Sequence, residues 1–204
     1  MPLHNTHQLT LPLIHTRNPI QPSADRTDLA ASLGNSFMTL NRFPNLSSAD
    51  VCRHAPEIGN AGEALVSSWA ARRGLHPVTA PAGAQFDHIF TVGQHLIRLQ
   101  TKTTVGPGRD GKYHFRMTRG NSGDPNGTCR YGADAFDIAA LVFLDLGVVY
   151  FTAERKVSHK FSPDEANLIA HAELECFYDC LLTLGIISQC QFEELTADDL
   201  PACG

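Results

Sequence analysis

Three polar side chains within residues 85–103 have the types and the spacing of a catalytic group. Asp87 lies near the start of this stretch, and Gln100 and Lys102 lie near its end with one residue between them. Residues two apart on a β-strand point to the same face of a sheet, so Gln100 and Lys102 are expected to emerge side by side. A carboxylate, an amide oxygen and an ammonium group would then share one patch.

This combination of groups suits the metal-assisted hydrolysis of a phosphodiester bond. Mg²⁺ takes oxygen ligands and keeps several of its waters, so a carboxylate, an amide and a backbone carbonyl can hold it. We therefore predict Asp87 and Gln100, helped by the carbonyl of Thr101, as ligands of Mg²⁺ or Mn²⁺. Lys102 is expected to position the attacking water or to neutralise developing charge. The alternative is an exposed strand face that merely carries polar residues.

A β-hairpin is the element that must bring these groups together. The dipeptide Gly93-Gln94 is a turn signal, and residues with high strand propensity lie on both sides of it, namely Phe86, Ile89, Val92, Leu96, Ile97 and Leu99. Pairing through this turn places Asp87 at the same end of the hairpin as Gln100 and Lys102.

A helix is predicted before the hairpin. Asn60 is a favoured N-cap residue. Glu63, three residues later, can accept a hydrogen bond from the backbone N–H of Asn60, and its charge is favourable at the positive end of the helix dipole. Gly74 is expected to end the helix. The spacing predicts a buried stripe of four residues, Leu65, Ser68, Trp69 and Arg72. Glu63 would then bring a further carboxylate to the hairpin, as a metal ligand or as support for one.

Further strands are predicted after the hairpin. Residues 112–118 alternate between apolar and polar, which is typical of a strand with one buried face. Residues 136–144 form a nearly continuous apolar run, which indicates a strand covered on both faces, and residues 148–152 are its expected neighbour. Between residues 119 and 132 we expect a long loop.

The chain is expected to form one α/β domain with additions at both ends. Residues 1–50 are interpreted as an N-terminal arm with an irregular helix, residues 51–156 as the core, and residues 157–204 as an acidic C-terminal helical extension. Ser162, Pro163 and Glu165 have the pattern of a helix start, and one helix is expected to run from there to Gly185.

Charge is distributed unevenly along the sequence. The formal net charge is -5, yet residues 95–131 carry seven Lys or Arg against two acids, whereas residues 161–204 carry nine acids and no Lys or Arg. Such asymmetry can steer a polyanion to one face, and the alternative is a solvated basic loop beside a solvated acidic helix. We predict double-stranded DNA as the partner, contacted by Arg98, Arg109, Lys112, His114, Arg116, Arg119 and Arg130.

The sequence offers no sign of a membrane or secretory context. No stretch approaches the roughly 20 apolar residues that span a bilayer, and residues 1–17 lack the charged start and apolar run of a signal peptide. We therefore expect a cytoplasmic protein with no membrane partner. Six scattered cysteines without a CxxC pair argue against a disulfide framework or a zinc site.

Taken in order, the motifs of residues 59–156 resemble the PD-(D/E)xK nuclease superfamily, and within it the endonucleases associated with group I introns. The resemblance implies a restriction-endonuclease-like mixed sheet flanked by helices, with the metal site where the hairpin meets the first helix. It is carried by Gly59-Asn60-Ala61-Gly62-Glu63, Phe86-Asp87, the Ile97 to Thr103 strand, the Tyr131 to Asp137 segment and Val149-Tyr150-Phe151. An Asp such as Asp137 recurs in the superfamily at the start of a core strand, and the resemblance implies structural hydrogen bonds for it more than a role as metal ligand.

By this resemblance Asp87 matches the metal-binding Asp, Lys102 the catalytic Lys and Glu63 the Glu of the first helix. Phe86 stands where the superfamily has Pro, and Gln100 stands where it has Asp or Glu. The resemblance thus implies a Mg²⁺-dependent endodeoxyribonuclease, which we expect as a homodimer or higher homo-oligomer. A Gln oxygen can bind Mg²⁺ but brings no charge, so a catalytically inactive DNA-binding module on the same fold is one alternative. A Holliday-junction resolvase-like nuclease is another.

Overall fold

The computed structural model describes residue 34, residues 36–120 and residues 127–198. The chain divides into two compact units, Met1–Met38 and Thr39–Gly204. In the first unit the described residues, 34 and 36–38, are helical. The predicted arm up to residue 33, most of the predicted Asn- and Gly-rich loop at 121–127 and the last six residues of the predicted extension lie outside the described residues.

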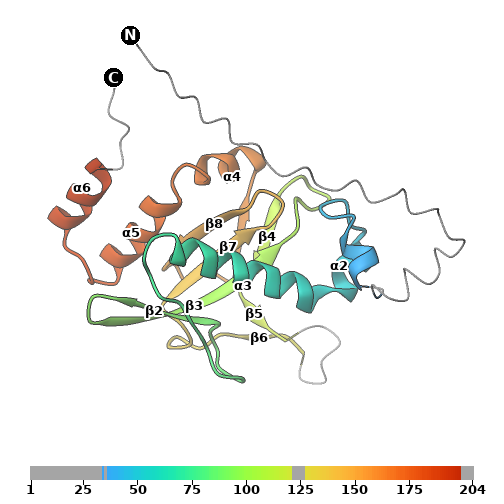
Figure 1. Ribbon diagram of the computed structural model, residues 1–204, viewed down its shortest axis with the longest axis horizontal. Coiled ribbons are helices and arrows are strands. Elements are labelled where there is room, and N and C mark those ends of the chain that lie inside the picture. Colours follow the sequence, from blue (N-terminus) through green and yellow to red (C-terminus); the bar gives the residue numbers. More distant parts are fainter. Residues whose placement is uncertain (1–33, 35, 121–126, 199–204) are drawn as a thin grey trace, which may run out of the picture. The chain divides into compact units, whose positions relative to one another are not determined.

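A mixed five-stranded sheet forms the centre of the second unit (Figure 1). The strand order is β1-β2-β3-β7-β8, in which β3 and β7 are parallel and all other neighbours are antiparallel. This arrangement confirms the predicted α/β fold. The strands are β1 (Val78–Thr79), β2 (His88–Val92), β3 (His95–Thr104), β7 (Ile138–Phe143) and β8 (Val148–Thr152).

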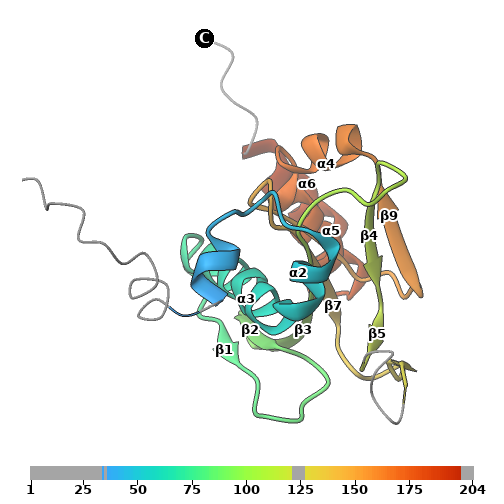
Figure 2. The ribbon, with the colours of Figure 1, turned by 90° about the vertical axis from the view of Figure 1, so that its right-hand side faces the viewer.

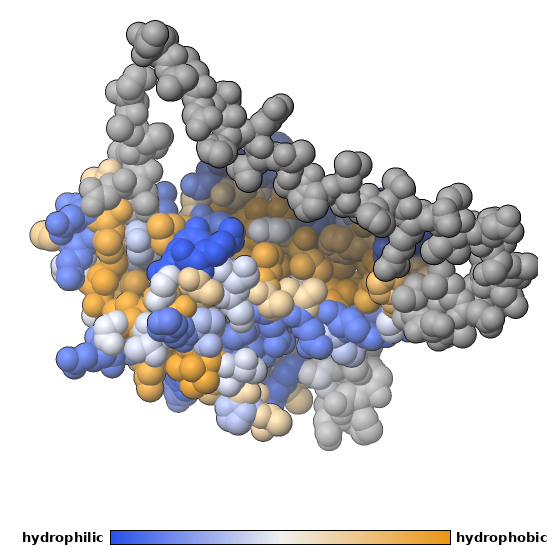
Figure 3. All heavy atoms as spheres, viewed as in Figure 1, coloured by the Kyte–Doolittle hydropathy of each residue, from blue (hydrophilic) through white to orange (hydrophobic). Residues whose placement is uncertain are grey.

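Helices cover one face of the sheet. The helices α3 (Ala55–Ala71) and α5 (Glu173–Thr183) contribute Trp69 and Phe177, which enclose Phe151 of β8 with ring centroids 4.4 and 5.3 Å from it. Trp69 is fully buried, and Phe177 is nearly so. The face seen in Figure 3 carries hydrophilic residues beside hydrophobic ones, and the exposed side of α3 likewise combines Glu57, Asn60 and Ser68 with alanines. Burial of large aromatic rings therefore fixes both helices on the sheet.

The other face is covered by a small antiparallel sheet and a short helix. The strands β4 (Tyr113–Arg116) and β9 (Ser158–Phe161) pair with each other, and Figure 2 shows them on the side of β7 opposite to α3. The helix α4 (Pro163–Ile169) adds Ala166 and Ile169 to the same core. All six residues of β7 are buried, as predicted, because this central strand alternates its side chains between the two cores.

The predicted hairpin is confirmed. β2 and β3 pair from His88 opposite Leu99 to Val92 opposite His95, which leaves Gly93-Gln94 as the two-residue turn. Gly93 has a positive φ of 58°, a conformation that glycine adopts without steric cost. The two-residue turn therefore fixes which residues of β2 and β3 face each other, and so the position of Asp87 next to Gln100.

The start of α3 differs from the prediction. The helix begins at Ala55 with His54 as its N-cap, so Asn60 lies inside the helix and the predicted cap was wrong. Pro56 in the first turn favours the earlier start. The first backbone N–H groups of a helix have no acceptor within the helix, so a proline, which lacks an N–H, costs nothing there. The buried side was also only partly predicted: Trp69 is buried, but Val66 and Ala70 take the places expected for Ser68 and Arg72.

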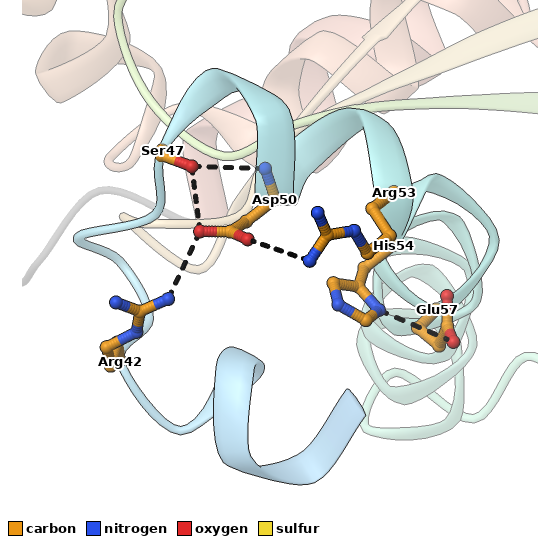
Figure 4. Close-up of polar contacts among 6 residues, drawn as sticks. All are labelled: Arg42, Ser47, Asp50, Arg53, His54 and Glu57. Atoms are coloured by element: carbon orange, nitrogen blue, oxygen red, sulfur yellow. Dashed lines mark hydrogen bonds and ion pairs between the residues drawn. The ribbon is translucent and has the colours of Figure 1, made fainter. Parts of the chain in front are cut away.

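A short preceding helix, α2 (Ser48–Arg53), fixes the direction of entry into α3 (Figure 4). The Ser47 side chain accepts a hydrogen bond from the backbone N–H of Asp50 and donates one to its carboxylate. The same carboxylate binds Arg42 at 3.1 Å and Arg53 at 3.7 Å. These contacts satisfy the start of α2, and His54 then lies 3.7 Å from Glu57 of α3.

The C-terminal helix is broken where one continuous helix was expected. The predicted capping box is confirmed, because Ser162 and Glu165 bond each other's backbone N–H groups. However, α4 ends at Ile169 and α5 begins at Glu173, so the prediction of one helix to Gly185 was wrong. The break has a packing cause, since α4 joins the core on one face of the sheet and α5 the core on the other. The helix α6 (Gln189–Asp198) follows.

Two short paired strands lie in the connection between the parallel strands β3 and β7. β5 (Thr118–Arg119) and β6 (Cys129–Arg130) pair at the two ends of the segment expected to be a long loop. None of the helices that the structure describes is long and apolar enough to span a membrane.

Candidate active site

The predicted groups meet where β3 extends past the start of β2. On one side β3 pairs with β7 through Thr104, whereas on the other side its pairing with β2 stops at Leu99. Asp87, the residue before β2, still donates its backbone N–H to the carbonyl of Leu99 at 2.8 Å. Beyond that bond, residues 100–104 have no strand partner on the β2 side among the described residues. The edge of β3 is therefore open at the residues predicted for the site.

A pocket of about 370 Å³ lies at this open edge. Its lining combines the carboxylate of α3, the residue that precedes β2 and four consecutive residues of β3. The structure thus brings together the five residues predicted for catalysis or metal binding: Glu63, Asp87, Gln100, Thr101 and Lys102.

Neutral N–H groups bind the Asp87 carboxylate. The Gln100 amide nitrogen donates to Asp87 Oδ2 at 2.6 Å, and the Thr101 backbone nitrogen donates to the same oxygen at 2.6 Å. The Gln100 amide nitrogen also donates to the carbonyl of Thr101 at 3.1 Å. It therefore lies between the two oxygens predicted as metal ligands. The nitrogen and oxygen of an amide exchange places by rotation about its last bond, so Gln100 can present either one to its neighbours.

The two acids of the pocket are held in an environment that disfavours their charge. Burial raises the pKa of Asp87, although the Thr101 N–H and the charge of Lys102 oppose the rise. Burial, followed by the charge of Asp87, also raises the pKa of Glu63. Two close carboxylates with raised pKa values gain free energy from a cation placed between them.

The donor chemistry fits a hard divalent cation. Within the described part of the chain no three His, Cys, Asp or Glu side chains cluster as metal ligands. The pocket instead offers two carboxylates, an amide and a backbone carbonyl, which suit Mg²⁺ or Mn²⁺ better than zinc. Thr101 Oγ1 is buried and has no hydrogen-bond partner among the described residues, which leaves one more oxygen in the lining.

Lys102 is held by a tyrosine that the sequence interpretation did not assign to the site. Its Nζ donates to Tyr131 Oη at 2.8 Å and lies 5.0 Å from the centroid of the ring. Burial lowers the pKa of Lys102, opposed by the charge of Asp87. Burial, with a contribution from Asp87, raises the pKa of Tyr131 to about 12. Tyr131 therefore stays a neutral phenol, and the lysine is shifted toward its neutral amine.

Gly62 was also missed, although it determines how closely Glu63 approaches the sheet. A Cβ atom on Gly62 would overlap the side chain of Thr103 on β3. The absence of that atom lets α3 lie directly against β3 at the level of the pocket. A glycine inside a helix costs about 1 kcal/mol relative to alanine, so its presence signals a close approach of this kind.

Several residues predicted to bind DNA are exposed near the pocket. His114 and Arg116 are on the outward side of β4, and with Lys102 and Thr103 they line a second pocket of about 420 Å³. His114 Nε2 also contacts the Asp110 carboxylate at 2.8 Å. Because Lys102 lines both pockets, the basic strand is continuous with the candidate active site. The other exposed residues of this group are Arg109, Lys112, Arg119 and Arg130.

Arg98 differs from the other predicted DNA contacts because all three of its side-chain nitrogens have partners. Nε and one terminal nitrogen bind the two oxygens of Asp137 at 3.0 and 2.8 Å, and the other terminal nitrogen binds the carbonyl of Asp134. The Arg98 backbone N–H also donates to Asp137 at 2.8 Å. Asp137 thus makes the structural hydrogen bonds that were predicted. Burial alone would raise its pKa, but the bonds from Arg98 hold the pKa below the ordinary value.

Among known proteins, the chain resembles solved structures but no protein family or curated protein that was compared. No family model matches the chain, and no curated protein matches it either. Among solved structures, a bacterial homing endonuclease, I-Ssp6803I, aligns with a TM-score of 0.46 and 17% sequence identity, over 52% of this chain and 76% of that chain. A likeness of this degree defines neither a family nor an activity.

Proposed function

We propose that this protein is a divalent-metal-dependent endonuclease of the PD-(D/E)xK type, in which Gln100 replaces the acid of the motif, and that it cleaves double-stranded DNA. The observation that carries the proposal is the convergence of two carboxylates, an amide and a lysine on one pocket at the open edge of β3. These groups come from α3, from β3 and from the residue before β2, and their types match the needs of phosphodiester hydrolysis.

The proposal gives each side chain a role. Asp87, Gln100 and the carbonyl of Thr101 would hold Mg²⁺ or Mn²⁺, with Glu63 as a further carboxylate. When bound, such an ion polarises a phosphoryl oxygen and makes a bound water more acidic. The lowered pKa of Lys102 favours an amine that accepts a proton from the attacking water. The water oxygen then bonds to phosphorus, the bond from phosphorus to the leaving oxygen breaks, and the leaving oxygen takes up a proton from a solvent water.

The basic surface supports DNA as the substrate. Arg116 and His114 line a pocket that shares Lys102 with the candidate active site, so a phosphate bound there lies on the path to Lys102. Exposed arginines and lysines bind the DNA backbone mainly through charge, without reading its sequence. The predicted contacts on β4, β5 and β6 therefore act to position the duplex.

A DNA-binding module without catalysis is the second candidate. The observation that favours it is the hydrogen bond from the Gln100 amide nitrogen to Asp87 Oδ2, which satisfies that oxygen without a metal ion. Replacing an acid by Gln removes one charged contact, which weakens ion binding by about 1–3 kcal/mol. Such a module would bind duplex DNA with a steep dependence on salt and leave it intact.

A cleavage assay separates the two candidates. Plasmid, linear duplex and four-way junction DNA are incubated with the full-length protein and Mg²⁺, Mn²⁺ or a chelator. We expect cleavage that requires the metal ion and falls by about 10²–10³-fold in Asp87→Ala and in Lys102→Ala. The control is Arg72→Ala, which changes an exposed residue at the end of α3. Undiminished cleavage in both site variants would refute the proposal.

A further inference from the structure

A third pocket, of about 290 Å³, is connected to the candidate active site through Tyr131. Tyr131 lines this pocket and also binds Lys102 Nζ through its hydroxyl group. The residues that matter for its chemistry are Arg130, Tyr131, Phe136, Glu154, Arg155 and Lys156. Two of them, Arg155 and Lys156, follow β8 and belong to no group predicted from the sequence. The pocket is therefore a distinct site beside the reacting groups.

Arg155 is positioned by an aromatic ring and not by an acid. Its guanidinium carbon lies 4.1 Å from the centroid of Phe136, and Phe136 in turn packs edge-on against Tyr131 at 5.2 Å. In the described part of the chain Arg155 makes no hydrogen bond or ion pair, in contrast with Arg98. A guanidinium stacked on a ring keeps the N–H groups of its edge available for a planar or tetrahedral anion.

The lining of the pocket is positively charged. Arg130, Arg155 and Lys156 face a single acid in the lining, Glu154, whose carboxylate is bound to Lys156 at 2.7 Å. Two further acids act on Arg155 from outside the lining. One is Asp137, which is already bound to Arg98, and the other is the exposed Asp134. Three cations against one acid leave the pocket with a net charge that attracts an anion.

The aromatic rings of the pocket are not available to stack on a base. Arg155 covers Phe136, while Tyr131 is packed edge-on against Phe136 and lies under Lys102 Nζ. A nucleobase needs an open ring face, whereas a phosphate needs N–H donors and positive charge. The lining therefore matches a phosphate group better than a base.

We propose that this pocket binds a backbone phosphate of the DNA strand being cleaved, a few nucleotides from the scissile phosphate, with Arg155 as its main donor. The inference rests on the proposed function, because it takes the DNA strand to pass Lys102. Phosphates of one strand repeat about every 3.4 Å along the duplex axis, and one side chain, Tyr131, joins this pocket to Lys102. A strand with its scissile phosphate beside Lys102 thus brings a neighbouring phosphate to Arg155.

The test measures the affinity of the full-length protein for a labelled duplex by fluorescence anisotropy over a series of salt concentrations, with a chelator present. Arg155→Ala is expected to bind about tenfold more weakly and to lower the slope of log affinity against log salt by about 0.9, the value for one phosphate contact. Arg155→Lys keeps the charge, so it should keep the slope while losing part of the affinity. Arg72→Ala, the matched control, should leave both quantities unchanged.

The outcomes distinguish this pocket from the proposed catalysis. If Arg155→Ala matches Arg72→Ala in affinity and slope, the phosphate site is refuted even if the wild-type protein cleaves DNA. If the wild-type protein binds DNA without cleaving it, the proposed endonuclease fails, and a loss of slope in Arg155→Ala still supports the pocket. A wild-type protein that binds no duplex refutes both. Thermal melting checks that each variant is folded, and Arg155→Gln replaces Arg155→Ala if the latter does not fold.

Discussion

Two carboxylates beside β3 have pKa values that the structure shifts in opposite directions. Asp137 binds the guanidinium and the backbone N–H of Arg98, and these bonds hold its pKa below the ordinary value. Asp87 binds two neutral N–H groups, and burial raises its pKa above the ordinary value. The first carboxylate is stabilised as an anion by the protein itself. Under the proposed function, the second would be stabilised by a bound cation.

The position along β3 explains the difference. Arg98 lies where β3 is paired with β2 and where β7 is about to begin, so Asp137 meets it between paired strands. Asp87 lies where β2 stops and the edge of β3 is open to a pocket. A closed position favours a complete ion pair, whereas an open one leaves room for an ion and a substrate. The two acids thus differ in their partners, because a charged guanidinium binds Asp137 and neutral N–H groups bind Asp87.

The largest predicted effect on stability comes from breaking the closed pair. Asp137→Asn leaves Arg98 without its charged partner and should lower the free energy of unfolding by about 2–3 kcal/mol. Asp87→Asn removes a charge that burial disfavours, so its free energy of unfolding should equal or exceed that of the wild-type protein. Urea denaturation at pH 7 with a chelator measures both. Equal losses in the two variants would show that the carboxylates are not different.

The stability of each variant relative to the wild-type protein should depend on pH. Asp137→Asn should lose stability at neutral pH, whereas Asp87→Asn should keep or gain it, and both differences should disappear in acid. The lowered pKa of Asp137 means that its contribution to stability is present above the unfolded value of about 3.9 and is lost as pH falls through the folded value. The deficit of Asp137→Asn should therefore shrink in acid. The raised pKa of Asp87 means that its charge costs stability above the folded value and costs nothing below about pH 3.9. Any advantage of Asp87→Asn should therefore also vanish in acid.

A smaller effect on the free energy of unfolding is expected at Gly62, which lets α3 and Glu63 approach β3 closely. Gly62→Ala places a methyl group against Thr103 and should lower the free energy of unfolding by about 1–2 kcal/mol through overpacking. Gly59→Ala, one turn earlier in α3, meets no atom within 4 Å and should instead stabilise the helix by about 0.5–1 kcal/mol. Urea denaturation of both variants tests this, and stabilisation by Gly62→Ala would contradict the close approach of α3 to β3.

The hairpin, and the closeness of Asp87, Gln100 and Lys102 within it, could be predicted from residues that are neighbours in the sequence. Gly93 fixes the turn, and the two-residue period then determines that Gln100 and Lys102 share a face near Asp87. The strand at 148–152 and the capping box at Ser162 were found for the same reason, since each depends on neighbours in sequence. The structural role of Asp137 was implied by the family resemblance, in which such an Asp begins a core strand, and its bonds to Arg98 confirm it.

Features set by distant packing could not be predicted in the same way. The capping pattern at Asn60 and Glu63 indicated a helix start, but the contacts around α2 and Pro56 begin the helix earlier. The break after α4 exists because the two helices serve opposite faces of the sheet, which no local pattern encodes. Tyr131 reaches Lys102 across 29 positions of sequence, and only the fold reveals that contact.

The most direct test of the account is the rate of duplex DNA cleavage as Mg²⁺ is titrated, in the wild-type protein and in Gln100→Glu. Gln100→Glu places the acid of the proposed motif beside Asp87, so it should bind the ion about 1.4 kcal/mol more tightly and reach its half-maximal rate at about one tenth of the Mg²⁺ concentration. The wild-type protein should cleave at the higher concentration. If the wild-type protein binds the duplex but neither protein cleaves it with Mg²⁺ or Mn²⁺, the pocket at the open edge of β3 is not a nuclease site.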